Sequence, residues 1–287
     1  MYTMFISKLA SLAVIFAAAV TSMFLYSAAN ADALDEIKAR GTIIAGIDPT
    51  FAPFEFMDAN NKIVGYDAEL IEAIAADWGV AVEYQVMAFS GIIPGLIAGS
   101  FDMSVSALNV TAERAKRISY TVPIASTTNA IMKRSDDSSV TGSNIDDLSG
   151  LKSAVKQTTQ PEQMMQKFNE KLKAAGKPEV QLMSFDTVEQ TVAALMDNRV
   201  DFITDDKIVL AQVMKARPDA KLEIVGEIGG SALIAWGVNK SNPSLTDALN
   251  ETIKKLKKDG TLGELQMKYF GFMINDLPEK DFIPTSS

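Results

Sequence analysis

The sequence predicts an α/β protein whose sheets are largely parallel. Strand-like and helix-like segments alternate along the chain from residue 42 onward, and this alternation is typical of α/β layers. The helix-like segments carry one apolar face, as in "AELIEAIAADWG", which ends at Gly79. A chain of 287 residues suffices for one large domain or two of ordinary size, and its 47% hydrophobic residues indicate a globular fold.

The first half of the chain contains short elements separated by glycines and turn signals. A strand is predicted over residues 42–48, and Asn60-Asn61 predicts a turn that leads into a second short strand. The remaining elements are a helix, a strand, a short helix and a strand, over residues 68–79, 80–86, 91–99 and 101–107. A helix then begins near Ala112, with Thr111 as its N-cap.

The second half repeats the alternation without a proline-rich linker or an internal repeat. Strands are predicted over residues 129–134, 151–157, 180–185, 199–206 and 232–240. Helices are predicted over residues 161–174 and 187–198, and two more close the chain at 244–259 and 261–270. Two lobes would therefore be connected by strands rather than by a flexible linker.

Residues 1–31 have the layout of a secretory signal peptide. Lys8 is their only charged residue, residues 9–26 carry no charge, and Ala29-Asn30-Ala31 forms an A-x-A cleavage site. An uncleaved membrane anchor is the alternative, since eighteen uncharged residues barely suffice to span a bilayer. We expect cleavage before Asp32 and export of the mature chain.

The composition excludes several function classes. A net charge of −9 argues against nucleic acid as a partner. The chain has no Cys and no His, so it has no disulfide, no Ser-His-Asp triad and no thiolate or imidazole metal site. Any chemistry would rest on carboxylates, Lys, Tyr or hydroxyls, and we expect no catalytic residue, no cofactor and no metal.

The stretch "NVTAERAKRI" places Arg114 in the first turn of the helix that begins near Ala112. Free backbone N–H groups and a guanidinium in one place form a site for an anion such as a carboxylate. From the spacing alone, a solvated arginine on an exposed helix is the favoured interpretation. Lys116 and Arg117 are predicted to be surface charges.

Motifs along residues 34–271 carry a family resemblance. They include "GIDPTFAPFEFMDANNKIVGYDAELIEAIA", "FSGIIPGLIAGSFDM", "SALNVTAERAKRISYTVPI", "KQTTQPE" and "NRVDFITDD". In this order and spacing, the chain resembles the periplasmic amino-acid-binding proteins of ABC importers, the polar-amino-acid group of type II solute-binding proteins. The resemblance implies two α/β lobes, joined by two β crossovers that form a hinge, which close over one amino acid.

The resemblance also implies domain boundaries and partners. Lobe 1 would contain residues 32–128 and 236–287, and lobe 2 residues 129–235, with crossovers near 128–130 and 235–237. The partners would be a free amino acid or close derivative and the permease subunits of an ABC transporter, and the protein would be a monomer. A periplasmic dehydratase-type enzyme on the same fold and a sensory partner of a membrane receptor are the alternatives.

Site residues follow from the resemblance, residue by residue. Arg114 would hold the ligand α-carboxylate, and Asp206 would pair with the α-ammonium. The remaining ligand-binding positions are Asp48, Phe51, Phe89, Ser106, Ala107, Asn109, Thr158, Thr159 and Asp205. Asn109 stands where the family usually has Thr or Ser, and Gln157 where it often has Gly. Asp48 and Asp205 together would make the pocket acidic and favour a polar or cationic side chain.

Overall fold

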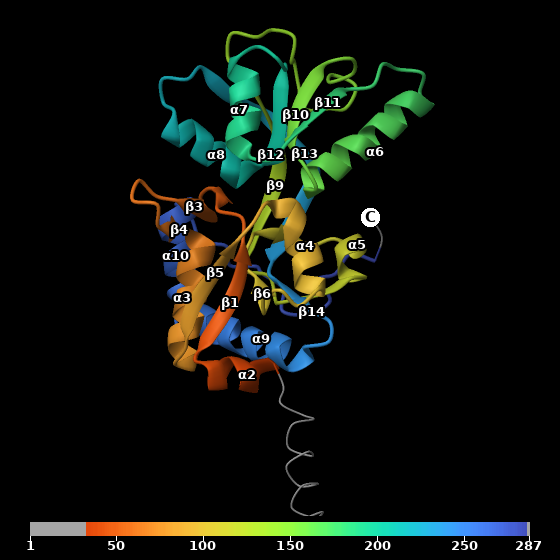
Figure 1. Ribbon diagram of the computed structural model, residues 1–287. Coiled ribbons are helices and arrows are strands. Elements are labelled where there is room, and N and C mark those ends of the chain that lie inside the picture. Colours follow the sequence, from red (N-terminus) through yellow and green to blue (C-terminus); the bar gives the residue numbers. More distant parts are fainter. Residues whose placement is uncertain (1–32, 286–287) are drawn as a thin grey trace, which may run out of the picture.

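In the computed structural model, which describes residues 33–285, the strands form a five-stranded, a six-stranded and a small three-stranded sheet. Figure 1 shows two lobes, with the five-stranded sheet in the lower one and most of the six-stranded sheet in the upper one. The predicted signal peptide lies outside the described residues. Within residues 33–285, the helices are too short or too polar to cross a bilayer.

The five-stranded sheet has the order β5-β1-β6-β14-β8. These strands are β1 (Thr42–Ile47), β5 (Ala81–Val86), β6 (Met103–Ser104), β8 (Ile118–Tyr120) and β14 (Gly237–Asn239). β1 pairs in parallel with β5 and β6, and Ala45 lies opposite Met103. β14 is antiparallel to both of its neighbours, so the returning chain completes this sheet.

Helices from both ends of the described chain cover the five-stranded sheet. They are α2 (Ala33–Arg40), α3 (Tyr66–Trp78), α4 (Phe89–Ile97), α9 (Pro243–Lys258) and α10 (Thr261–Phe270). α9 packs on α2, α3, β8 and β14, and α10 packs on α3 and α9. The sequence predicts this packing of the two C-terminal helices on the N-terminal segment. The small sheet beside them contains β2 (Thr50–Phe51), β3 (Glu55–Met57) and β4 (Ile63–Val64).

The six-stranded sheet has the order β11-β10-β12-β9-β13-β7. These strands are β7 (Leu108–Asn109), β9 (Ala125–Arg134), β10 (Lys152–Lys156), β11 (Gln181–Phe185), β12 (Phe202–Asp206) and β13 (Leu222–Ala235). α6 (Gln160–Ala174), α7 (Val188–Met196) and α8 (Lys207–Ala216) pack on this sheet. α7 begins with a complete capping box between Thr187 and Gln190, which fixes its start.

The expectation of largely parallel sheets is only partly met. β10 is parallel to β11 and β12, but β9 is antiparallel to β12 and β13, and β13 to β7. The antiparallel part arises because β9 and β13 carry the chain out of one lobe and back into it (Figure 1). The register between them shifts at Gly229 and Gly230, whose positive φ values of 79° and 85° favour glycine.

A buried carboxylate connects the returning strand to the first lobe. Trp236, which is fully buried between β13 and β14, donates its indole N–H to Asp67 Oδ2 over 2.8 Å. The backbone N–H of Ala107 donates to the same oxygen over 3.0 Å. Asp67 on α3 therefore positions both the end of the crossover and the loop that follows β6.

We predict that Leu249→Ala lowers the free energy of unfolding by about 2–5 kcal/mol, because Leu249 is fully buried on α9 and the substitution leaves a cavity. Urea unfolding measures the change. Glu251→Ala, at an exposed position of the same helix, serves as the control and should change stability by no more than about 0.5 kcal/mol. Equal effects at the two positions would contradict the packing of α9 in the core.

Candidate functional site

The candidate site lies where strand ends of the two larger sheets meet. A small cavity there has room for about one water molecule. The volume open to the centre of that molecule is about 10 Å³. Its lining residues are Phe51, Phe89, Ala107, Asn109, Lys156, Thr159, Pro161 and Asp205. Six of the eleven residues predicted from the sequence line this cavity, and the other five lie close to it along the chain or in direct contact.

Arg114 lies beside this cavity in the short helix α5 (Ala112–Ala115). The predicted N-cap is confirmed, since Thr111 Oγ1 accepts a hydrogen bond from the Arg114 backbone N–H. The guanidinium is buried; it donates to the Asn109 carbonyl over 3.0 Å and to the Thr158 carbonyl over 2.9 Å. The interpretation as a solvated arginine is therefore wrong. With two of its five N–H donors in these bonds, Arg114 bridges the chain segments that follow β7 and β10.

Two adjacent carboxyl groups lie next to Asn109 in the site. Asp205 and Asp206 end β12 and are both buried. The Asn109 amide donates to both Asp206 oxygens over 3.3–3.4 Å. Asp205 Oδ1 accepts from the Asp206 backbone N–H, whereas its buried Oδ2 has no hydrogen-bond partner among residues 33–285. A donor group entering the cavity would satisfy this oxygen.

Burial raises the pKa of both carboxyls. The pKa of Asp206 rises to about 8, first through desolvation and then through the negative charge of Asp205, although Asn109 and Arg114 oppose the rise. Desolvation raises the pKa of Asp205 to about 6. A cationic group beside this pair would stabilise the charged forms and reverse both shifts.

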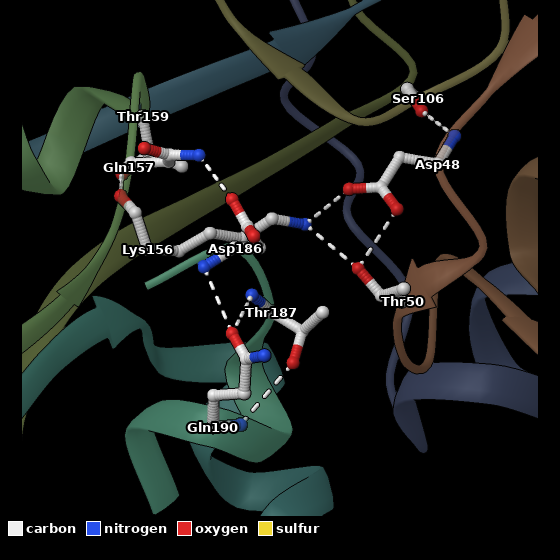
Figure 2. A network of polar contacts seen from close by, with 9 residues as sticks. All are labelled: Asp48, Thr50, Ser106, Lys156, Gln157, Thr159, Asp186, Thr187 and Gln190. Carbon is white, nitrogen blue, oxygen red and sulfur yellow. Dashed lines mark hydrogen bonds and ion pairs between the residues drawn. The ribbon is translucent and has the colours of Figure 1, made fainter. Parts of the chain in front are cut away.

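A buried lysine is the main feature that the sequence did not predict. Lys156, at the end of β10, donates to Asp48 Oδ2 over 2.7 Å and to Thr50 Oγ1 over 3.1 Å (Figure 2). Its side chain is 1% exposed and that of Asp48 is 5% exposed. The ammonium also lies 5.1 Å from the ring centroid of Phe51 and 5.2 Å from that of Phe89.

This ion pair corrects the expectation of an acidic pocket. The preference for a cationic side chain was based on Asp48 and Asp205 alone, but Lys156 neutralises Asp48 and lies between the two predicted aromatic residues. The signal was present in the sequence, because Lys156 directly follows the apolar residues of "LKSAVKQ" at a strand end. Its partner lies 108 residues away, so spacing could not reveal the pair.

The remaining predicted residues mainly shape the backbone of the site. Ser106 Oγ accepts from the Asp48 backbone N–H over 2.8 Å, and Ala107 is bonded to Asp67. Thr159 is the N-cap of α6 and donates to the Lys156 carbonyl over 2.5 Å. Thr158, rather than Gln157, adopts the positive φ of this loop, at 60°. A neighbouring cavity of about 260 Å³ is lined by Thr158, Arg114 and Phe89 together with surface residues.

Comparison with known proteins identifies the family. Residues 43–272 match the family model described as bacterial extracellular solute-binding proteins, family 3. The chain belongs to this family. Family 3 proteins capture a solute outside the cytoplasmic membrane and deliver it to a transporter.

Individual relatives support the family assignment. The probable amino-acid ABC transporter-binding protein of Haemophilus influenzae is 28% identical over 253 residues, which covers 88% of this chain and 93% of the relative. An ancestral arginine-binding protein, solved bound to arginine and bound to glutamine, is 34% identical, with TM-scores of 0.74 and 0.73 and coverage of 81% of this chain and 99% of that one.

A further structure, AncCDT-1, is an ancestral amino-acid-binding protein and a precursor of cyclohexadienyl dehydratase. It is 30% identical, with a TM-score of 0.74, and the match covers 84% of this chain and all of that one. These neighbours share the two-lobed fold of type II binding proteins.

We predict that the ligand-free protein loses stability as the pH rises from about 5.5 to about 8.5. An aspartate in an unfolded chain has a pKa of about 3.9, whereas burial raises the pKa of Asp206 to about 8. In this pH range the folded state therefore holds protons that the unfolded state has released, so the free energy of unfolding falls by roughly 1–3 kcal/mol. Urea unfolding at several pH values measures the slope.

Asp206→Asn isolates the contribution of this carboxyl, since the buried acids Asp67 and Glu55 also have raised pKa values and act in the same direction. The variant should show a shallower slope between pH about 6 and about 8. An unchanged slope would mean that Asp206 is already ionised in the folded protein.

Proposed function

We propose that this protein binds a free amino acid between its lobes and delivers it, as a monomer, to the permease subunits of an ABC transporter. The observation that carries the proposal is that a buried guanidinium, Arg114, and a buried carboxyl group, Asp206, both bond to Asn109, which lines the cavity. A buried zwitterion must have both charges paired, or its desolvation would cancel the gain from binding.

The roles of the site residues follow from their charge. Arg114 would hold the α-carboxylate in a two-pronged contact, supported by the Thr158 hydroxyl and the Thr159 backbone N–H next to the start of α6. Asp206 would accept from the α-ammonium, and this pairing would lower its raised pKa. Ser106, Ala107 and Asn109 would form the wall of the cavity next to the α-carbon.

Ligand binding and lobe closure are coupled in this arrangement. Two hydrogen bonds cross the site, from Arg114 to Thr158 and from Asn109 to Asp206. In the proposed division at residues 128–129 and 235–236, each of them connects lobe 1 to lobe 2. With room for about one water molecule, the cavity must widen to admit an amino acid. The ligand would enter the open form and then stabilise the closed form by bridging both lobes.

We infer that the protein is a binding protein rather than an enzyme. A dehydratase would require a general acid at the leaving hydroxyl, and Asp205, with a pKa of about 6, is the acid closest to the cavity. Its position next to Asp206 equally suits a ligand ammonium, so no additional reaction is needed to explain it. The related structure AncCDT-1 is itself an amino-acid-binding protein.

Calorimetry tests the proposal directly. The purified chain from Asp32 onward is unfolded and refolded to remove any copurified ligand, and then titrated with each common amino acid. We expect saturable 1:1 binding of at least one of them. If no α-amino acid binds, the proposal fails.

We predict that Arg114→Ala weakens amino-acid binding by roughly 3–5 kcal/mol, about 100- to 5000-fold in Kd, because a buried carboxylate would lose its partner. Arg114→Lys should recover only part of the affinity, since an ammonium cannot make the two-pronged contact. Titration calorimetry gives the Kd values, and circular dichroism verifies folding.

Lys116→Ala and Arg117→Ala are the matched controls. Both side chains are exposed, and Lys116 pairs with the exposed Glu113. Their substitution should change the binding free energy by well under about 1 kcal/mol. Should Arg114→Ala bind as tightly as these controls do, Arg114 does not hold the ligand.

We also propose export to the periplasm with cleavage after Ala31. N-terminal sequencing of the native product should give a start at or near Asp32, because Ala29-Asn30-Ala31 has the small residues that a signal peptidase requires. Recovery of the intact chain in the membrane fraction would instead support an uncleaved anchor.

A further inference from the structure

We propose that Lys156 is an internal cation in the side-chain part of the site, and that it restricts the ligand to amino acids with a neutral amide side chain. This inference rests on the proposed function, and it names the ligand class of the same site.

The ammonium of Lys156 occupies the position that a cationic ligand would need. Phe51 and Phe89 are the aromatic residues expected to flank the ligand side chain, and Asp48 is the acid expected at its end. Lys156 Nζ lies 5.1 and 5.2 Å from the two ring centroids and 2.7 Å from Asp48 Oδ2. The cation–π contacts and the ion pair that arginine or lysine could make are therefore already made by the protein.

A cationic ligand would have to overcome this arrangement. It could lie beside Lys156 only with two like charges in a buried site, which is unfavourable. It could displace Lys156 only by breaking a pair whose side chains are 1% and 5% exposed. Both routes weaken the binding of arginine and lysine relative to a neutral ligand.

The hydrogen-bonding groups left at the cavity fit an amide. An ammonium has three N–H donors, and Lys156 uses two of them, to Asp48 and Thr50. Lys156 and Asp205 both line the cavity, and Asp205 Oδ2 has no partner among the described residues. A side-chain amide supplies a carbonyl that accepts from Lys156 and N–H groups that donate to the neighbouring carboxylates.

A carboxylate side chain fits less well. Its oxygens could accept from Lys156, but an ionised carboxylate has no N–H or O–H to donate to the neighbouring carboxylates of Asp205 and Asp48. An aliphatic side chain would leave both the third N–H of Lys156 and Asp205 Oδ2 unpaired. A ligand that leaves buried polar groups of the site unpaired binds much more weakly than one that pairs them.

The test compares the Kd values of glutamine, asparagine, glutamate, arginine and lysine for the wild-type chain and for Lys156→Met, which keeps the length of the side chain and removes its charge. For the wild type, we expect an amide amino acid to bind about 10- to 100-fold more tightly than arginine or lysine. Lys156→Met should weaken amide binding and strengthen arginine binding by a similar factor, because Asp48 is then available to the ligand.

Two controls separate charge from shape. Asp48→Asn combined with Lys156→Met removes both charges, and it should lose the gain in arginine binding. Lys152→Met, at the exposed start of the same strand, should leave all the Kd values unchanged. Circular dichroism verifies the folding of each variant, and the ranking of ligands by the wild type does not depend on any variant.

Three outcomes would overturn the inference. Tighter binding of arginine than of any amide amino acid by the wild type would contradict it, as would an unchanged ratio of arginine to amide affinity in a folded Lys156→Met variant. Both outcomes would leave the proposed function intact, since an amino acid still binds. Failure of every α-amino acid to bind would refute the proposed function as well.

Discussion

The requirement that buried charges be paired governs the region between the lobes. Arg114, Lys156, Asp48, Asp205 and Asp206 are all buried there. Lys156 and Asp48 satisfy each other, whereas Arg114 is held by carbonyl groups and Asp206 by an amide. A desolvated ion without an opposite charge is unstable, so the proposed zwitterion would contribute most at the Arg114 and Asp206 positions.

The fold places these groups together by a common geometric rule. In each lobe, the parallel strands end at the side of the sheet that faces the other lobe, so Asp48, Lys156 and Asp206 converge from β1, β10 and β12. Asp67 links this edge to the crossover, because it accepts from both Ala107 and Trp236. A movement of the crossover would therefore be transmitted to the cavity wall at Ala107.

Local patterns in the sequence predicted the elements better than the contacts between them. The N-cap at Thr111 and the stop at Gly79 are visible because capping depends on a few adjacent residues. α8 and the first half of β13 were missed, since "KIVLAQVMKA" is rich in β-branched residues and β13 is interrupted by Gly226, Gly229 and Gly230. Lys156 and Asp48 are 108 residues apart, and residue spacing does not encode such a long-range pair.

The two sets of charges have different consequences for closure. Lys156 and Asp48 pair with each other inside the protein, so this contact does not require the α-groups of a ligand. A buried ion pair adds little net stability compared with apolar packing, but it strongly disfavours a competing charge. In the proposed function, Arg114 and Asp206 would bias the equilibrium toward closure only when both ends of a zwitterion are present. On the proposed roles, affinity for the α-groups and selection of the side chain would be separable, because different residues would carry them.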